Sequence, residues 1–200
     1  MAYRDFNISD LQNKLGLKLS SEKLFPNFKP VLPSSWLTES LEKKRRTIRI
    51  TTEKAVSEVV ISAVLADIQD RNTDKTTLFS GEILTADKSL GLNGEIDFIF
   101  VGQANAPEIV YPVISITEAK LNQSIEKAKS QAIAQMRGAQ VYNKRHNTES
   151  HTIYGVITNG TQWIFMRLEN DTITFDDNEY LINDLPSILG IFQEIINSFQ

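Results

Sequence analysis

The chain has 200 residues, of which 41% are hydrophobic and 23% are charged, and its net charge of −4 argues against a protein that coats nucleic acid through its overall field. It contains no cysteine, so disulfides, thiolate metal sites and cysteine nucleophiles are excluded. The longest apolar runs, such as residues 59–66, are too short to span a bilayer, so we expect a soluble, cytoplasmic protein with no membrane partner.

Residues 1–50 form the first predicted unit, an accessory segment in which three prolines interrupt any long periodic pattern. Ser34–Ser35 can cap a short helix that runs through Arg46. The end of that helix carries the densest positive charge of the chain, Lys43–Arg46, with Arg49 just beyond. Taken alone, such a group is more typical of a solvated helix face than of a binding surface.

A longer helix is expected from Thr51 or Thr52 to about Gln69, because apolar residues recur there at three-to-four spacing. Three strands are then expected, over residues 77–85, 94–101 and 111–119. The last two are separated by a short turn, and we expect them to form an antiparallel hairpin.

Good helix formers predict a helix over about Ser124–Asn143. Two further strands and an edge strand are expected, over residues 151–158, 161–168 and 172–175. The first two are joined by Asn159–Gly160, a strong hairpin signal. Asp184 can cap a final helix whose apolar residues make one stripe.

Charged residues end two faces of the predicted hairpin that otherwise look buried. Alternate side chains of a strand share a face, so Glu118 and Lys120 extend an apolar face of the second strand, and Asp97 extends one of the first. If Val101 pairs with Ile114, the same register sets Asp97 opposite Glu118. Two carboxylates would then face each other.

Carboxylates at that distance repel each other unless positive charge lies between them, and a divalent cation would supply it. Magnesium prefers oxygen ligands and usually takes one or two protein carboxylates, so Asp97, Glu118 and the backbone carbonyl of Ala119 would make an open site. Lys120 would lie within reach of the attacking water or of a phosphate. An isolated Glu-x-Lys is common, and it is the order of the elements around it that favours a metal site.

The residues of this hairpin resemble the core of the PD-(D/E)xK superfamily of restriction-endonuclease-like nucleases. The similarity lies in residues 91–99 and 114–120, followed by a helix, and it covers roughly residues 51–168. More narrowly, the chain resembles a group of bacterial proteins of about this size, frequent in cyanobacteria, that share a strand like residues 152–156. One departure is Ile96, which stands where the superfamily has proline.

This resemblance implies a fold, an activity and three residue roles. The implied fold is a central mixed sheet flanked by helices over residues 51–200, with residues 1–50 as a helical N-terminal extension. Asp97 corresponds to the first metal-binding acid, Glu118 to the second and Lys120 to the catalytic lysine. The implied activity is Mg²⁺- or Mn²⁺-dependent hydrolysis of nucleic acid, with DNA as the expected substrate, and by analogy the protein could act as a homodimer.

The resemblance also implies roles for residues on two helices. Many members use a glutamate on the helix before the sheet, and we favour Glu58 over Glu53, because a first-turn position suits a solvated or capping role. The superfamily often places glutamine on the later helix, where Gln131 and Gln135 share one face, with Tyr142 two turns further on. Both glutamines could equally face water.

Two classes of function therefore remain. One is a metal-dependent nuclease, which the complete set of two acids and a lysine favours. The other is a catalytically idle member of the same fold that binds nucleic acid or another protein through the basic N-terminal segment, which the negative net charge favours. A plain structural domain would require Asp97 and Glu118 to lie far apart.

Overall fold

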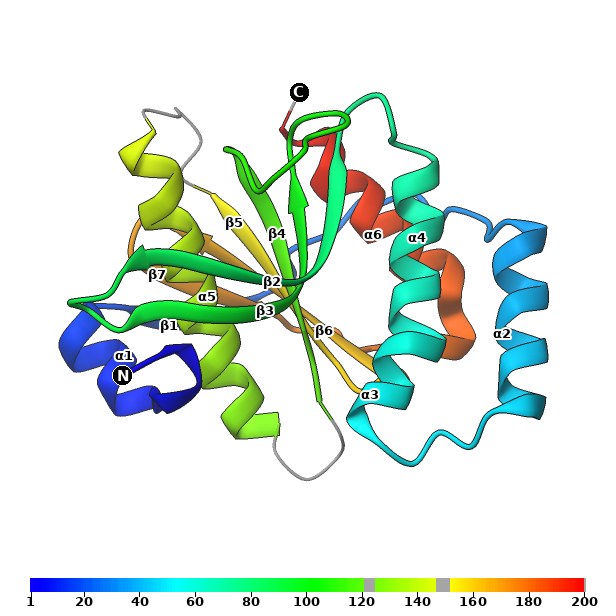
Figure 1. Cartoon of the computed structure of the whole chain (residues 1–200), viewed down its shortest axis with the longest axis horizontal. Helices are drawn as coiled ribbons and strands as arrows, with labels where there is room; N and C mark the ends of the chain where they lie inside the picture. The colour runs from blue at the N-terminus through cyan, green and yellow to red at the C-terminus, as the bar shows by residue number, and fades with distance from the viewer. Residues whose placement is uncertain (121–124, 147–151, 200) are drawn as a thin grey trace.

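The computed structural model describes residues 1–120, 125–146 and 152–199 of an α/β protein (Figure 1). Its strands are β1 (Lys18–Glu22), β2 (Thr77–Asp87), β3 (Leu92–Val101), β4 (Val113–Ala119), β5 (Ile153–Thr158), β6 (Gln162–Glu169), β7 (Thr172–Asp176) and β8 (Tyr180–Leu181). They form one mixed sheet in the order β1-β7-β6-β5-β4-β3-β2, with β8 paired to β6. Strands β1 and β7 are parallel, as are β4 and β5, and the other pairs are antiparallel.

The helices are α1 (Ile8–Leu15), α2 (Ser35–Thr47), α3 (Glu53–Val56), α4 (Ser62–Asp70), α5 (Ile125–Arg145) and α6 (Leu185–Asn197). A π-helical turn, Ser57–Ile61, joins α3 to α4, so the predicted long helix is confirmed as one continuous helical run. None of the helices in the described residues is long and apolar enough to cross a membrane. The predicted starts of α5 at Ser124 and of β5 at His151 lie outside the described residues.

Helices cover both faces of the sheet and enclose two cores. Helices α5 and α1 pack on one face, and α4, α6 and α2 lie on the other (Figure 1). In the core between the sheet and helices α4, α6 and α2, the rings of Phe165 and Phe192 meet edge to face, with centroids 5.4 Å apart. Residues 1–50 contribute to both cores, through Tyr3 and Leu11 on the α5 side and Leu37 on the α4 side.

The antiparallel hairpin of β3 and β4 is confirmed, but its register changes along its length. Phe98 to Phe100 pair with β4 in the predicted register. A shift then pairs Val101 with Val113, so the predicted pairing of Val101 with Ile114 is wrong. An extra residue of this kind is a β-bulge, and here it turns Ile114 into the core beneath α4 and α6.

Strand β7 is not the edge strand that its sequence predicts, because β1 pairs with it and takes that place. The five residues of β1 are all exposed. No alternation of polar and apolar side chains therefore marks β1 as a strand.

The predicted helix starts are confirmed at two positions and changed at a third. The hydroxyl of Ser34 accepts the N–H of Leu37 at 3.1 Å, and the hydroxyl of Thr52 accepts that of Ala55 at 3.1 Å. Asp184 stands at the N-cap position of α6, but its side chain makes no capping hydrogen bond.

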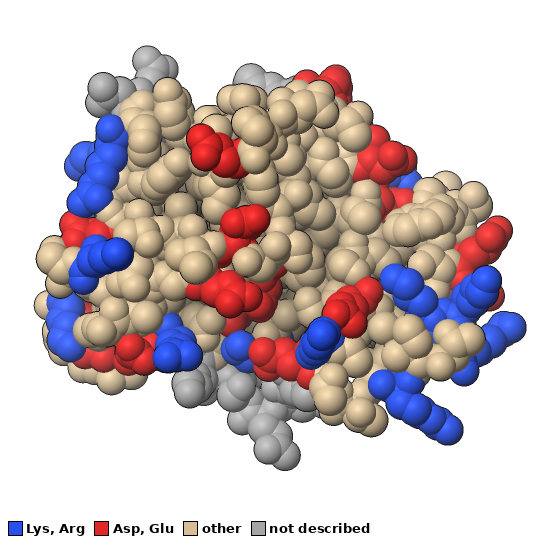
Figure 2. All heavy atoms as spheres, in the orientation of Figure 1, with Lys and Arg blue, Asp and Glu red and all other residues tan. Residues whose placement is uncertain are grey.

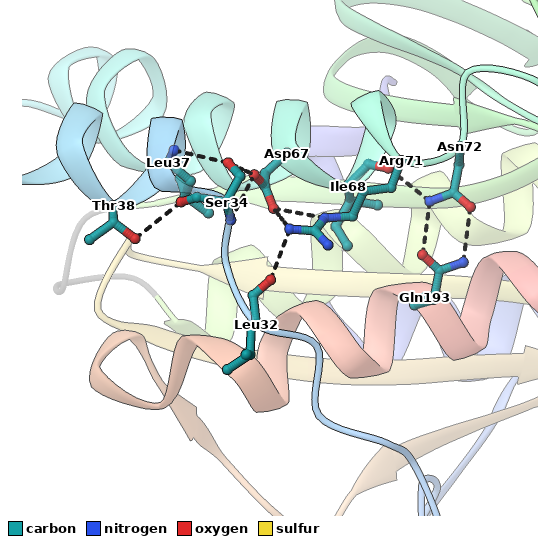
Figure 3. A network of polar contacts seen from close by, with 9 residues as sticks. All are labelled: Leu32, Ser34, Leu37, Thr38, Asp67, Ile68, Arg71, Asn72 and Gln193. Carbon is teal, nitrogen blue, oxygen red and sulfur yellow. Dashed lines mark hydrogen bonds and ion pairs between the residues drawn. The ribbon is translucent and has the colours of Figure 1, made fainter.

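A polar network fastens the N-terminal segment to α4 (Figure 3). The carboxylate of Asp67 is only 3% exposed and accepts hydrogen bonds from the hydroxyl and the backbone N–H of Ser34. Arg71 donates to Asp67 at 3.1 Å and to the carbonyl of Leu32 at 2.8 Å. One buried carboxylate thus joins the start of α2 to α4.

Candidate active site

Asp97 and Glu118 lie side by side, just beyond the last residue pair that joins β3 to β4. That pair joins Phe98 to Thr117, each one residue from one of the acids. The backbone N–H of Ala119 donates to Oδ2 of Asp97 at 2.7 Å, which holds Asp97 against the end of β4. The predicted juxtaposition of the two carboxylates is therefore present.

Lys120 follows directly and links two acids from different elements. Its Nζ lies 2.9 Å from Oε1 of Glu118 and 3.0 Å from Oε1 of Glu53. Its backbone N–H donates to the carbonyl of Thr158 at 2.9 Å, which continues the pairing of β4 with β5 beyond the strand end. The lysine is thus held by its backbone on the sheet and by its side chain between α3 and β4.

Gln135 holds the other oxygen of Glu118 from the α5 side. Its amide donates to Oε2 of Glu118 at 2.8 Å and more weakly to the carbonyl of Glu95 at 3.4 Å. Gln131, one turn earlier on α5, lines the cavity beside Glu118. Tyr142 does not belong to this surface, since its hydroxyl donates to the carbonyl of Ile109 at 3.0 Å, near the start of β4.

The two candidate glutamates of the preceding helix are placed differently. Glu53 contacts Lys120, whereas the side chain of Glu58 is 65% exposed and lies 3.7 Å from the ammonium of Lys54. Both line the same cavity as Asp97. Direct contact with the site thus comes from Glu53, the residue that the sequence analysis did not favour.

Burial and neighbouring carboxylates raise the pKa values of both central acids. Burial, together with nearby Asp97, raises the pKa of Glu118 to about 7. Burial also raises the pKa of Asp97, against the lowering effect of the Ala119 N–H. Burial lowers the pKa of Lys120, but the carboxylates of Glu118 and Glu53 outweigh it and raise that pKa above its ordinary value. Lys120 therefore stays protonated and positively charged beside two carboxyl groups that ionise less readily than usual.

Stability should depend on pH through Glu118 when no divalent cation is bound. The folded protein keeps the proton on Glu118 up to about pH 7, whereas the unfolded chain releases it near the ordinary value of 4.5. The folded state thus binds more protons between these values, so the free energy of unfolding falls as pH rises through them. Glu118→Gln cannot ionise and is expected to be more stable than the parent by about 2 kcal/mol at about pH 8, with little difference at about pH 5.

Urea denaturation of both proteins at the two pH values, in EDTA, measures this difference. A stability difference between parent and Glu118→Gln that is the same at both pH values would show that Glu118 ionises in the folded protein as it does in the unfolded chain.

Two cavities open on either side of Asp97 and share Asp97 and Glu95 as lining residues. One, of about 520 Å³, extends toward Lys54 and the π-helical turn. The other, of about 470 Å³, extends past Glu118, Lys120 and Gln131. Both are large enough to admit part of a substrate. Figure 2 shows acidic side chains over the middle of this face, with most Lys and Arg nearer the two sides.

The donor set fits one hard divalent cation with few protein ligands. Within the described residues, no group of three or more His, Cys, Asp or Glu side chains is arranged to hold a metal ion. Two neighbouring carboxylates with raised pKa values nevertheless form an oxygen-rich site, and a cation between them would relieve their repulsion. Magnesium is satisfied by such a pair, because it keeps several waters and takes substrate phosphate oxygens.

Glu95 lines both cavities, although it is not among the predicted site residues. It stands two residues before Asp97 on β3, and alternate residues of a strand share a face. The same alternation that identified Asp97 could therefore have found Glu95. The contact of Glu53 with Lys120 is tertiary, and no local pattern predicts it.

Comparisons with known proteins identify no family. A scan against models of protein families finds no match to this chain, and no curated protein is significantly similar to it. The geometry of the site and the order of the surrounding elements are therefore the basis for assigning a function.

Proposed function

We propose that this protein is a Mg²⁺- or Mn²⁺-dependent nuclease that hydrolyses phosphodiester bonds in DNA. The observation that carries the proposal is the contact of the Lys120 ammonium with the buried Glu118, 2.9 Å away, beside a second, partly buried acid, Asp97. A lysine and two acids that meet at the end of an antiparallel strand pair supply both a cation site and a positive charge for phosphate.

The order of elements around the site supports the same proposal. A helical run, three antiparallel strands, the long helix α5 and a strand parallel to β4 follow one another along the chain. This succession resembles the core of restriction-endonuclease-like nucleases, with the acids on the second and third strands. The overall architecture alone would not indicate an activity, since one fold hosts many functions.

In the proposed site, Asp97 and Glu118 would hold the cation, with the backbone carbonyl of Ala119 as a further ligand. Glu58 and Glu53, which line the same cavity as Asp97, are candidates for a third carboxylate. When bound, such a cation offsets phosphate charge and makes water a better nucleophile.

The protein's own residues position and stabilise the reacting groups. Lys120 would donate to a non-bridging phosphate oxygen as negative charge builds up there. Gln135 fixes the orientation of Glu118 through its 2.8 Å hydrogen bond. In the hydrolysis the water oxygen bonds to phosphorus while the bond to the leaving sugar oxygen breaks. The water gives up a proton and the leaving oxygen gains one.

The test is cleavage of supercoiled, linear and single-stranded DNA with magnesium, manganese or EDTA, for the parent protein and Asp97→Asn. Cutting is expected only with a divalent cation and should fall by about 100-fold in the variant, because even groups that hold a metal's ligands in place contribute about 10- to 100-fold. Glu39→Gln, which removes an exposed acid from α2, is the matched control and should cut like the parent. Folded parent protein that cuts none of these substrates would refute the proposal.

A second candidate function is nucleic-acid binding without catalysis. Four exposed cationic side chains lie at the end of α2 and just after it: Lys43, Arg45, Arg46 and Arg49. A local group of this kind attracts phosphate backbones even in a protein of negative net charge. Retention of DNA in a gel-shift assay, together with no cleavage under any condition above, would favour this function.

A further inference from the structure

The first residues of the chain are built into the wall of the candidate active site. Tyr3 is only 1% exposed and its ring lies against α5 at Gly138. A Cβ atom placed on Gly138 would come within 2.1 Å of the Tyr3 hydroxyl oxygen, so any side chain there would collide with the tyrosine. Gly138 thus forms a notch in α5 that receives Tyr3.

Hydrogen bonds fix the backbone around Tyr3 as well. The N–H of Ala2 donates to the carboxylate of Asp5 at 2.8 Å, and the N–H of Asp5 donates back to the carbonyl of Ala2 at 2.9 Å. The side-chain amide of Asn93, on β3, donates to the carbonyl of Met1 at 3.3 Å. The short turn Tyr3–Asp5 is therefore held in a defined place beside β3 and α5.

This anchoring brings Arg4 to the active-site cavity of about 470 Å³, which Asp97, Glu118 and Lys120 also line. The Arg4 side chain is 81% exposed, and the carboxylate it is paired with, that of Asp5, is 3.9 Å away. Lys120, the other cation that the described residues place at this cavity, is already engaged by Glu118 and Glu53. Arg4 therefore offers its guanidinium to a ligand in this cavity.

We infer that Arg4 binds a backbone phosphate of the nucleic-acid strand, next to the phosphate that Lys120 contacts; this rests on the proposed function. A centre that holds several carboxylates repels a polyanion, so the cavity needs a cation that is free to meet the strand. A guanidinium suits this role because it presents paired N–H donors to two phosphate oxygens at once. Tyr3 and Gly138 are positioning residues for Arg4.

The test compares the binding of DNA duplexes by the parent and Arg4→Gln, read by fluorescence anisotropy in calcium. In one series of duplexes, each backbone phosphate in turn is replaced by an uncharged methylphosphonate. Arg4→Gln is expected to bind the unmodified duplex about tenfold more weakly than the parent. At one position the methylphosphonate should weaken binding by the parent about tenfold and leave binding by Arg4→Gln unchanged. Arg4→Lys, which restores a positive charge, should recover part of the affinity that Arg4→Gln loses.

Lys18→Gln is the matched control, since it removes an exposed cation from β1, which four strands separate from β3. Lys18→Gln should lose as much affinity as the parent when the methylphosphonate stands at the sensitive position. Equal binding by Arg4→Gln and the parent, or position-dependent losses that are the same in both, would overturn the inference. Because binding is read without cleavage, a protein that binds through Arg4 but never cuts would support the inference and refute the nuclease, whereas a nuclease indifferent to Arg4 would do the reverse.

Discussion

Replacing Lys120 by methionine is expected to slow DNA cleavage by about 100-fold to 1,000-fold, the usual cost of removing one group that stabilises developing charge. Methionine keeps much of the length and apolar surface of the side chain but removes the ammonium that lies between Glu118 and Glu53. Cation binding should persist, because Asp97 and Glu118 are unchanged. Single-turnover cleavage with saturating magnesium measures the rate, and calorimetric titration with manganese measures cation binding.

Lys54→Met is the control for this experiment. Lys54 lines the neighbouring cavity, but its ammonium is exposed and lies 3.7 Å from Glu58 rather than in contact with the two central acids. It should therefore cut at nearly the parent rate when magnesium and DNA are saturating. A Lys120→Met variant that binds manganese and still cuts as fast as Lys54→Met would remove Lys120 from the proposed chemistry.

Asp67→Ala is expected to destabilise the protein by about 3 kcal/mol, because it leaves polar partners of a buried carboxylate unsatisfied. Ser34 and Arg71 both donate to Asp67, and Arg71 forms an ion pair with it at 3.0 Å (Figure 3). Without the carboxylate, the N-terminus of α2 loses its hydrogen bonds to α4. Urea denaturation followed by circular dichroism measures the free energy of unfolding.

Asp70→Ala provides the comparison, since it removes an exposed acid from the last turn of the same helix. A substitution at such a position usually changes stability by less than about 0.5 kcal/mol. If the two variants were equally stable, the buried network would contribute nothing beyond a surface charge.

Much of the candidate site follows from strand alternation alone. Two-residue periodicity on successive strands is enough to predict that Asp97 and Glu118 face each other, with Lys120 beside them. The predicted pairing of Val101 failed because a β-bulge inserts one residue between that position and the rest of the ladder. The bulge lies beyond the acids, so the error at one end of the hairpin did not reach the other.

The parts that sequence reasoning did not predict depend on tertiary contacts. Glu53 and Glu58 belong to one helical run, and a π-helical turn inside that run alters the helical spacing on which a choice between them would rest. Their contacts in the folded protein distinguish them, since Glu53 pairs with Lys120 and Glu58 with Lys54. Likewise, Tyr3 is an unremarkable residue in the sequence, and its place in the notch at Gly138 depends on how α5 packs against β3.

The pairing of β1 with β7 has a consequence for how the protein is made. Ser20 on β1 and its partner Thr174 on β7 are 154 positions apart, so residues 18–22 leave the ribosome long before their neighbouring strand exists. Until β7 has been synthesised, β1 has no strand to pair with. Contacts between residues so far apart in the sequence form late and slowly. Residues 18–22 are therefore among the first of the sheet to be synthesised but cannot take their place in it until β7 has emerged.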